Sequence, residues 1–182
     1  DTWGVDFGLI AADGKLIENP VHYRDKRNFG MIQEAAKYMP KDEMYERTGI
    51  QFMDFNSVFQ LLSLKLNRQY ILDSADKILF MPDLFNYMLT GEKRAEYSIA
   101  TTSQMVNINT KTWDAELLNA LGIPERLLCD IVPSGTKVGM LTDELCGELG
   151  LEKVPVIAVC GHDTQSSVTA VPNENKDFVF IS

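Results

Sequence analysis

The chain has 182 residues, of which 45% are hydrophobic and 24% are charged, a composition typical of one globular domain with a single core. The formal charge of −9, without any run of Lys or Arg, argues against nucleic acid as a partner, because clustered cations supply that affinity. No apolar run approaches the roughly 20 residues that a membrane helix needs, so no membrane partner is expected.

The cysteines and the chain ends give two further expectations. Cys129, Cys146 and Cys160 are widely spaced and odd in number, unlike a zinc site or a disulfide framework, so we expect no metal site and a reducing cytoplasm. The chain begins without Met on a strand-like segment and ends on another, which predicts a piece of a longer protein. The oligomeric state stays open.

The N-terminal segment predicts a strand followed by a tight turn. Apolar residues alternate with others over residues 3–10, the pattern of a strand with one buried face. The stretch Ala12-Asp13-Gly14-Lys15 has the composition of a turn. A short hairpin partner is therefore expected at residues 15–18.

Helices are predicted in the next third of the chain. Residues 29–39 and 41–48 are helical in composition, and Pro40 favours a break between them. Asn56 precedes a longer helix and is placed to cap it. The apolar residues of that helix cover one broad face, which favours a core over a cofactor site; they are Val58, Phe59, Leu61, Leu62, Leu64 and Leu66.

The rest of the chain alternates strands with helices. We expect strands at residues 77–81, 154–159 and 177–181, and helices at residues 83–89, 114–121 and 142–149 and from about Asp163. This pattern predicts an α/β fold with a helical elaboration. The strands at residues 3–10, 154–159 and 177–181 are expected in one sheet.

The stretch CGHDTQSSV, residues 160–168, follows a predicted strand at the edge where α/β folds collect their chemistry. Asp163 is either a helix N-cap that accepts the amide hydrogen of Gln165 or Ser166, or a base that faces a cleft. A serine nucleophile is disfavoured, because the Gly-x-Ser-x-Gly elbow is absent.

Several segments occur in an order that resembles the FGGY family of carbohydrate kinases. They are DTWGVDFG at residues 1–8, YRDKR at 23–27, TGIQF at 48–52, MPD at 81–83 with LTG at 89–91, and GHDT at 161–164. The resemblance covers nearly the whole chain. It implies part of an actin-like, ribonuclease H-like kinase domain within a protein of two such domains, which closes a cleft on sugar and Mg-ATP.

The resemblance also implies an activity and the residues that carry it. The expected reaction is transfer of the γ-phosphoryl group of ATP, with Mg²⁺, to O1 of L-rhamnulose; L-fuculose, xylulose and related ketoses are alternatives. Asp163 matches the catalytic aspartate of the family. The matched or candidate substrate-binding residues are Gly4, Arg24, Asp25, His162 and Thr164. A carboxylate that orients the attacking hydroxyl and takes its proton suits phosphoryl transfer.

The implied domain organisation is incomplete. Residues 1–182 resemble the N-terminal, sugar-side domain, with the first strands, the phosphate loops and the C-terminal nucleotide domain missing. No residue of this chain is therefore assigned to ATP or Mg²⁺. A stand-alone sugar-binding module without turnover is the alternative from another functional class.

Other polar residues are left with two readings each. Gln51 and Asn56 either reach the cleft or serve in local hydrogen bonding. Arg27 is a candidate for sugar hydroxyls or for a surface ion pair. Glu96 lies in a segment that resembles a Glu-Tyr-Thr motif of the family, with Ser98 in place of the threonine, and is otherwise a capped helix start.

Overall fold

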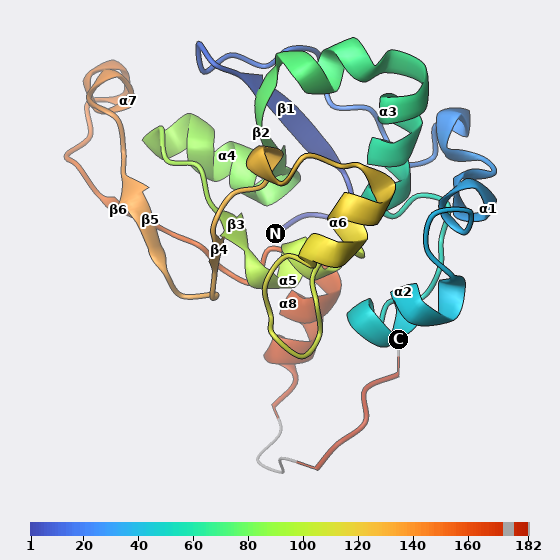
Figure 1. The fold of residues 1–182 in the computed structure, drawn as a ribbon. Coiled ribbons are helices and arrows are strands. Elements are labelled where there is room, and N and C mark those ends of the chain that lie inside the picture. The colour runs from blue at the N-terminus through green and yellow to red at the C-terminus, as the bar shows by residue number, and fades with distance from the viewer. Residues whose placement is uncertain (173–176, 182) are drawn as a thin grey trace.

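The computed structural model describes residues 1–172 and 177–181 (Figure 1). The strands are β1 (Phe7–Ala11), β2 (Ala75–Phe80), β3 (Ala95–Glu96), β4 (Ile131–Val132), β5 (Lys137–Met140) and β6 (Pro155–Ile157). The helices are α1 (Met31–Ala35), α2 (Lys41–Thr48), α3 (Ser57–Ser74), α4 (Met81–Thr90), α5 (Tyr97–Thr101), α6 (Ala115–Leu121), α7 (Asp143–Leu149) and α8 (Asp163–Ala170), with 3-10 turns η1 (Lys26–Asn28) and η2 (Glu125–Leu127).

The strands form separate pairs. β1 runs antiparallel to β2, β3 parallel to β4, and β5 antiparallel to β6. The prediction that residues 3–10 and 154–159 share a sheet is therefore wrong, because each finds a different partner along the chain. The predicted hairpin at the N-terminus is confirmed, since Ile10 bridges to Leu16 across the turn.

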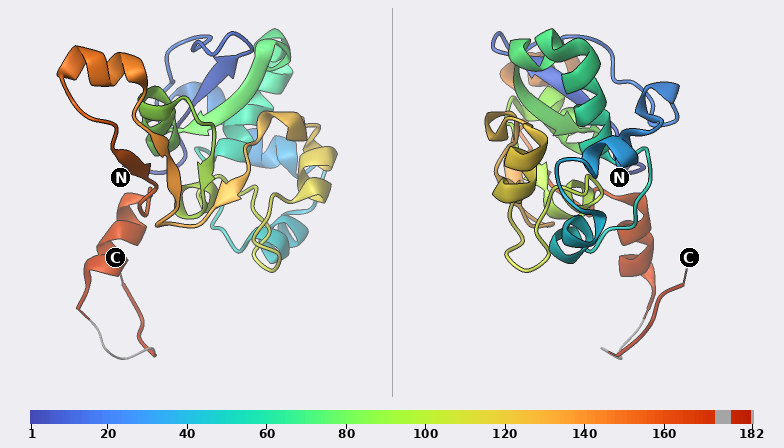
Figure 2. Two further views of the ribbon diagram at one scale, coloured as in Figure 1. Left: turned by 90° about the vertical axis from the view of Figure 1, so that its left-hand side faces the viewer. Right: turned by 45° about the vertical axis from the view of Figure 1, so that its right-hand side comes forward.

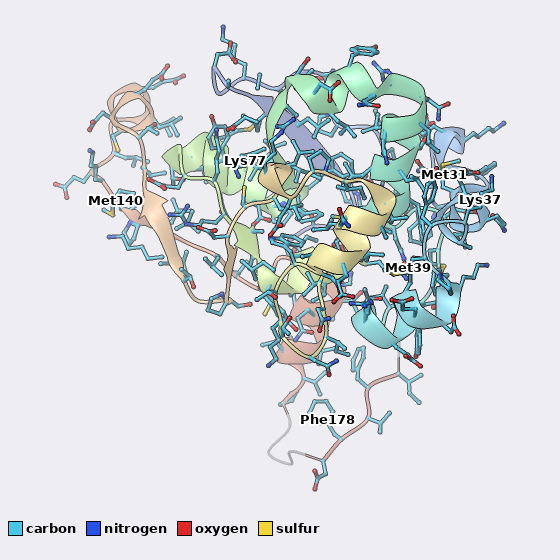
Figure 3. The ribbon with its side chains drawn as sticks, in the orientation of Figure 1. Met31, Lys37, Met39, Lys77, Met140 and Phe178 are labelled. Atoms are coloured by element: carbon cyan, nitrogen blue, oxygen red, sulfur yellow. The ribbon has the colours of Figure 1, made fainter. Side chains whose placement is uncertain are left out.

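The predicted strand at residues 177–181 is also wrong. The segment makes no strand pairing with any described strand, and Phe178 and Val179 are 49% and 87% exposed. Figure 3 shows Phe178 on the length of chain that lies away from the body of the molecule. Aromatic and β-branched residues favour a strand only where a neighbouring strand supplies hydrogen bonds and a surface to pack on.

The core lies between the β1–β2 pair and the helices that cover it. The first half of α3 is the most deeply buried helical segment, and most of its predicted apolar face is confirmed as core. Leu66 is the exception, at 44% exposed. Arg68 has non-helical angles, φ −146° and ψ 44°, and kinks the helix just beyond this point. Asn56 occupies the N-cap position without a side-chain capping bond, which corrects the capping prediction.

Most predicted helices are confirmed, but the bounds of two differ by more than one residue, and one of them is α4, which begins at Met81 and not at the predicted Asp83. The helix expected at residues 29–39 is reduced to α1: Gly30 takes a left-handed conformation at the N-cap with φ +81°, and the helix already ends at Ala35. α2 ends as predicted at Gly49, and Asp114 and Thr142 cap α6 and α7 through bonds from first-turn amides.

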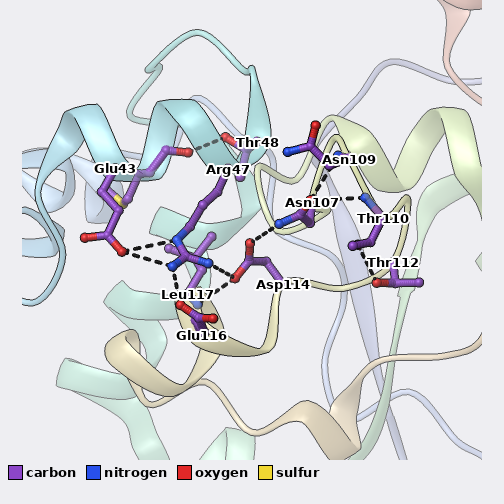
Figure 4. A network of polar contacts seen from close by, with 11 residues as sticks. Glu43, Arg47, Thr48, Asn107, Asn109, Thr110, Thr112, Asp114, Glu116 and Leu117 are labelled. Atoms are coloured by element: carbon purple, nitrogen blue, oxygen red, sulfur yellow. Dashed lines mark hydrogen bonds and ion pairs between the residues drawn. The ribbon is translucent and has the colours of Figure 1, made fainter.

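An ion-pair network joins α2 to the start of α6 (Figure 4). Arg47 contacts Glu43 at 3.1 Å and Asp114 at 3.4 Å, and it also pairs with Glu116. Asp114 accepts the amide hydrogen of Leu117 at 2.9 Å. This buried carboxylate thus both caps α6 and joins it to α2.

Two parts of the fold project from the body. Figures 1 and 2 show the β5–β6 hairpin with α7 on one side, and α8 pointing away below α5. Neither α7 nor α8 contains a buried residue. The position of α8 therefore depends on the turn that leads into it.

Candidate active site

A cavity of about 430 Å³ lies where the N-terminal segment, the loop before α3, the end of α5 and the start of α8 meet. Its lining combines aromatic and apolar side chains with a few polar groups, the usual make-up of a small-molecule site. The lining residues are Trp3, Gly4, Val5, Tyr23, Ile50, Gln51, Met53, Phe55, Asn56, Thr101, Thr102, His162 and Asp163. The prediction that Gly4 and Asp163 open on one cleft is confirmed.

A tight turn at Gly4–Asp6 forms one wall. The amide of Asp6 donates to the carbonyl oxygen of Gly4 at 2.9 Å, which closes a three-residue turn centred on Val5. Val5 has φ +68°, a value that a β-branched residue rarely adopts and that costs on the order of 1–3 kcal/mol. This turn explains why β1 begins only at Phe7 rather than at residue 3.

Hydrogen bonds from distant residues hold the turn in this conformation. The amide of Val5 donates to Thr102 Oγ1 at 3.0 Å. The carbonyl oxygen of Val5 accepts from Ser57 Oγ at 2.6 Å and from Gln60 Nε2 at 3.2 Å. The strained backbone is therefore fixed on both sides by side chains from α3 and from the end of α5.

Aromatic side chains form a second wall. Trp3 donates through Nε1 to Asp6 Oδ2 at 2.8 Å, which fixes its indole ring. Tyr23 meets Phe55 edge-to-face at 5.1 Å between ring centroids and stacks on His22 at 4.3 Å. These contacts give the cavity rigid apolar faces beside its polar groups.

The turn Gly161–Asp163 also lines the cavity and pairs with the N-terminal segment. The amide of Thr2 donates to the carbonyl oxygen of Gly161 at 2.8 Å, and the amide of Asp163 donates to that of Thr2 at 2.9 Å. The two backbone segments that carry Gly4 and Asp163 are thus bonded to each other directly.

Asp163 is the first residue of α8 and not its N-cap. His162 occupies the N-cap position, and its carbonyl oxygen accepts the amide hydrogen of Ser166 at 2.9 Å. The side chain of Asp163 is 55% exposed, and its Oδ1 accepts from the amide of Thr164 at 2.6 Å. The N-cap reading of Asp163 is therefore wrong, because the helix begins at Asp163 itself, and its carboxylate stays exposed beside the positive end of the helix.

The remaining predicted substrate-binding residues are divided among other places. Thr164 is exposed and donates to Asp163 rather than lining the cavity. Arg24 and Asp25 line a neighbouring cavity of about 490 Å³, which shares Tyr23 and Phe55 with the first. Asp25 caps η1 by accepting the amide hydrogen of Arg27 at 2.8 Å.

Sequence reasoning missed parts of the cavity that depend on long-range contacts. Gln51 and Asn56, left with two readings, both line it. Met53 and Phe55 also line it but lie in a loop without periodicity. Thr102 lies 97 residues from Val5 in sequence, and no local pattern links the two.

A buried carboxylate lies directly behind the Gly161–Asp163 turn. Glu96 Oε2 accepts the amide hydrogen of Gly161 at 3.0 Å, and Oε1 accepts from Ser134 Oγ at 2.6 Å. Glu96 also accepts the first-turn amides of α5, so the capped-start reading is confirmed. Burial alone raises the pKa of Glu96, but hydrogen bonds from Ser134, Ser98 and Gly161 outweigh it and lower the pKa.

A second buried carboxyl group lies beside it. Asp83 Oδ1 accepts the amide hydrogen of Glu96 at 3.1 Å, whereas Oδ2 is buried without a hydrogen-bond partner in the described part of the chain. Burial, with a smaller contribution from the charge of Glu96, raises the pKa of Asp83 to about 8. Asp83 is therefore neutral at pH 7 and leaves Glu96 as the ionised partner.

Asp83→Asn is expected to flatten the pH dependence of stability. The unfolded chain loses the Asp83 proton near its ordinary pKa of 3.8, whereas the folded protein keeps it to about pH 8. The contribution of Asp83 to the free energy of unfolding is therefore fully present below about pH 4 and is lost as the pH rises through about 8. Asparagine mimics the protonated form, so between pH 5 and 8.5 the variant should gain on the order of 4 kcal/mol over wild type, about 1.4 kcal/mol for each pH unit up to pH 8.

Urea unfolding of the full-length protein at the two pH values measures this gain. Asp13→Asn is the matched control, because that carboxylate is 60% exposed and pairs with the exposed Lys15. Equal pH slopes for wild type and Asp83→Asn would contradict the expectation.

The described residues contain no candidate metal-ion site. Nowhere in residues 1–172 and 177–181 do three or more His, Cys, Asp or Glu side chains gather as a metal site. Within the same residues, no helix has the length and apolar character needed to cross a membrane. The three cysteines are free thiols, and burial raises the pKa of Cys129 to about 11.

Comparison with known proteins identifies relatives over the whole chain. The model of the FGGY family of carbohydrate kinases, N-terminal domain, matches residues 2–170. The chain is 47% identical over 182 residues to rhamnulokinase of Bacteroides thetaiotaomicron and 41% identical to that of Oceanobacillus iheyensis. Each match covers 100% of this chain but 38% of the relative's length.

Solved structures have the same fold. Xylulose kinase from Rhodospirillum rubrum superposes with a TM-score of 0.83 at 19% identity, over 92% of this chain and 35% of that one. Ligand-bound xylulose kinase from Lactobacillus acidophilus gives 0.80 at 23% identity, over 93% and 35%. The expected α/β class, part of an actin-like, ribonuclease H-like kinase domain, is confirmed. The chain belongs to the FGGY family of carbohydrate kinases.

Proposed function

We propose that the full-length protein is an ATP-dependent kinase that phosphorylates L-rhamnulose at O1. The observation that carries the proposal is the position of Asp163, at the first turn of α8 on the cavity that Gly4 also lines. Relatives named rhamnulokinase, at 37–47% identity over the chain, support the choice of sugar.

In the proposed reaction Asp163 orients the O1 hydroxyl and receives its proton. The hydroxyl oxygen forms its new bond to the γ-phosphorus as the bond from that phosphorus to the β,γ-bridging oxygen breaks, and ADP leaves. The exposed carboxylate lies at the N-terminus of a helix, where negative charge is favoured, while the cavity positions the sugar.

ATP and Mg²⁺ are held mainly by parts of the full-length protein outside this chain, as the family resemblance implies. Bound there, ATP supplies the phosphoryl group and Mg²⁺ offsets the phosphate charge. Residues 1–182 then form the sugar-side half of the site. The free thiols and the use of ATP support a cytoplasmic location.

Turnover with a panel of ketoses tests the proposal. ADP release by the full-length protein should be most efficient with L-rhamnulose, with kcat/KM at least about 10-fold above that for L-fuculose or xylulose. A ketose that lacks one of the matching hydroxyls leaves a buried polar group of the protein without its hydrogen bond, which costs more than about 1 kcal/mol of binding free energy. Phosphorus NMR of the product should show a 1-phosphate. Preference for another ketose would overturn the sugar, and sugar binding without ADP release would indicate a binding module instead.

A further inference from the structure

α5 connects the two sides of the cavity. It is a helix of 5 residues, and the residue at each end bonds to a backbone segment that lines the site. Glu96, the N-cap, contacts the turn that carries Asp163. Thr102, the C-cap, contacts the turn that carries Gly4. Figure 1 shows α5 lying between the N-terminal segment and α8.

The Glu96 end makes more contacts than a helix cap needs. A cap requires only first-turn amides, which Ser98 and Ile99 supply at 3.0 and 3.2 Å. Glu96 also accepts from Gly161, 65 residues away, and from Ser134, 38 residues away. Ser98 Oγ extends this network, because it donates to Glu96 at 2.6 Å and accepts the amide hydrogen of His162 at 3.3 Å.

These bonds hold the turn that leads into α8, a helix without a buried residue. α8 contains no buried residue, so no apolar core side chain fixes its position. Its entry is held by Thr2 on one side and by Glu96 and Ser98 on the other. A Cβ at Gly161 would lie 3.1 Å from Glu96 Oε2 and 2.9 Å from Pro82 Cγ, so only glycine permits this close approach.

At the other end of α5, Thr102 holds the Gly4–Asp6 turn in the same way. Thr102 Oγ1 accepts the amide hydrogen of Val5 at 3.0 Å and donates to the carbonyl oxygen of Ile99 at 2.7 Å. A Cβ at Gly4 would lie 3.0 Å from Thr102 Cβ. The hydroxyl therefore ties the strained Val5 backbone to the last turn of α5.

We propose that Glu96 and Thr102 are positioning residues, which use α5 as a spacer to set the distance between the Gly4 turn and the carboxylate of Asp163. This inference rests on the proposed function for its kinetic consequences. Phosphoryl transfer needs the acceptor hydroxyl aligned with its base, and a displacement of 1 Å costs about 10²-fold in rate. The spacer supplies this alignment without contacting the reacting atoms.

Glu96→Gln in the full-length protein tests one end of the spacer. Glutamine keeps the size of the side chain, but its amide nitrogen cannot accept the hydrogen bonds that converge on the carboxylate. We expect kcat to fall about 10- to 100-fold, with KM for the sugar changed by less than about 3-fold. Thr102→Val should lower kcat/KM by a similar factor, and Thr102→Ser should lose much less, because it keeps the hydroxyl.

Asp114→Asn is the matched control for Glu96→Gln. Asp114 is also a buried N-cap carboxylate, but it bonds to α6 and Arg47 and has no contact with the cavity (Figure 4). It should lower stability without changing kcat at temperatures well below the unfolding midpoint. An equal loss of kcat in Asp114→Asn would show that general stability is the cause and would overturn the proposal.

Amide hydrogen exchange separates this inference from the proposed function. Exchange over residues 160–164 should become at least about 10-fold faster in Glu96→Gln and stay unchanged in Asp114→Asn, whatever ketose is turned over. Absence of kinase activity in the wild type would defeat the proposed function and leave this readout intact. Unchanged exchange, or kcat within 2-fold of wild type in Glu96→Gln, would overturn the positioning role.

Discussion

Asp163→Asn in the full-length protein is expected to lower kcat by about 10²- to 10⁴-fold while fold and sugar affinity are largely retained. Asparagine has nearly the same size, and its carbonyl oxygen still accepts the amide hydrogen of Thr164. The helix does not depend on this side chain for capping, because His162 holds the N-cap position. The amide cannot take the hydroxyl proton, so the loss falls on the chemical step.

Steady-state kinetics and a thermal unfolding scan measure the two halves of this expectation. Asp143→Asn is the matched control, because Asp143 is the first residue of α7, another helix without buried residues, and its side chain is 88% exposed. This control should keep wild-type kcat. Near-normal kcat in Asp163→Asn together with a much lower unfolding midpoint would make Asp163 a structural residue instead.

Local sequence patterns predicted the parts of the site that depend on neighbouring residues. Glycine after a helical run correctly marked the end of α2 at Gly49, and the helix predicted from Thr142 is α7, which begins one residue later with Thr142 as its N-cap. The apolar face of α3 was confirmed as core up to Leu64. The common cavity of Gly4 and Asp163 followed from their place in one ordered series of motifs, so the resemblance reached further than periodicity alone.

Features that depend on distant partners were not predictable in this way. A strand pattern does not name its partner, so residues 3–10 were assigned to the same sheet as 154–159, although β1 pairs with β2. The strain at Val5 is stabilised by Thr102, Ser57 and Gln60, which no sequence window around Val5 contains. Leu66 continues the apolar pattern of α3 but lies two residues before the kink at Arg68, and its side chain is exposed although Ile71 and Leu72 beyond the kink are buried again.

The position of Arg24 and Asp25 shows the limit of transferring a role by resemblance. Both belong to the matched YRDKR segment, yet they line the neighbouring cavity, and Asp25 is engaged in capping η1. Only Tyr23 of that segment reaches the cavity of Gly4 and Asp163. A role for Arg24 and Asp25 with the sugar therefore stays a prediction.

Phe59→Ala is expected to destabilise the protein by about 3–5 kcal/mol, the largest stability effect predicted for this chain. Phe59 is fully buried in α3, and its ring lies 6.1 Å from that of Phe52 between centroids. Removing the ring leaves a cavity in a packed core that relaxes only in part. Urea unfolding followed by far-UV circular dichroism measures the change.

Leu66→Ala on the same helix is the control, because Leu66 is 44% exposed and its truncation should cost less than about 1 kcal/mol. Equal losses for the two variants would contradict the assignment of the α3 face as core.

The same helix also supplies Ser57 and Gln60, whose side chains donate to the carbonyl oxygen of Val5. Those residues flank Phe59, so the cavity wall is lost only when the first half of α3 unfolds. We therefore expect Phe59→Ala to keep its kcat at temperatures well below its lowered unfolding midpoint. Kinase activity should fall only at temperatures near that midpoint.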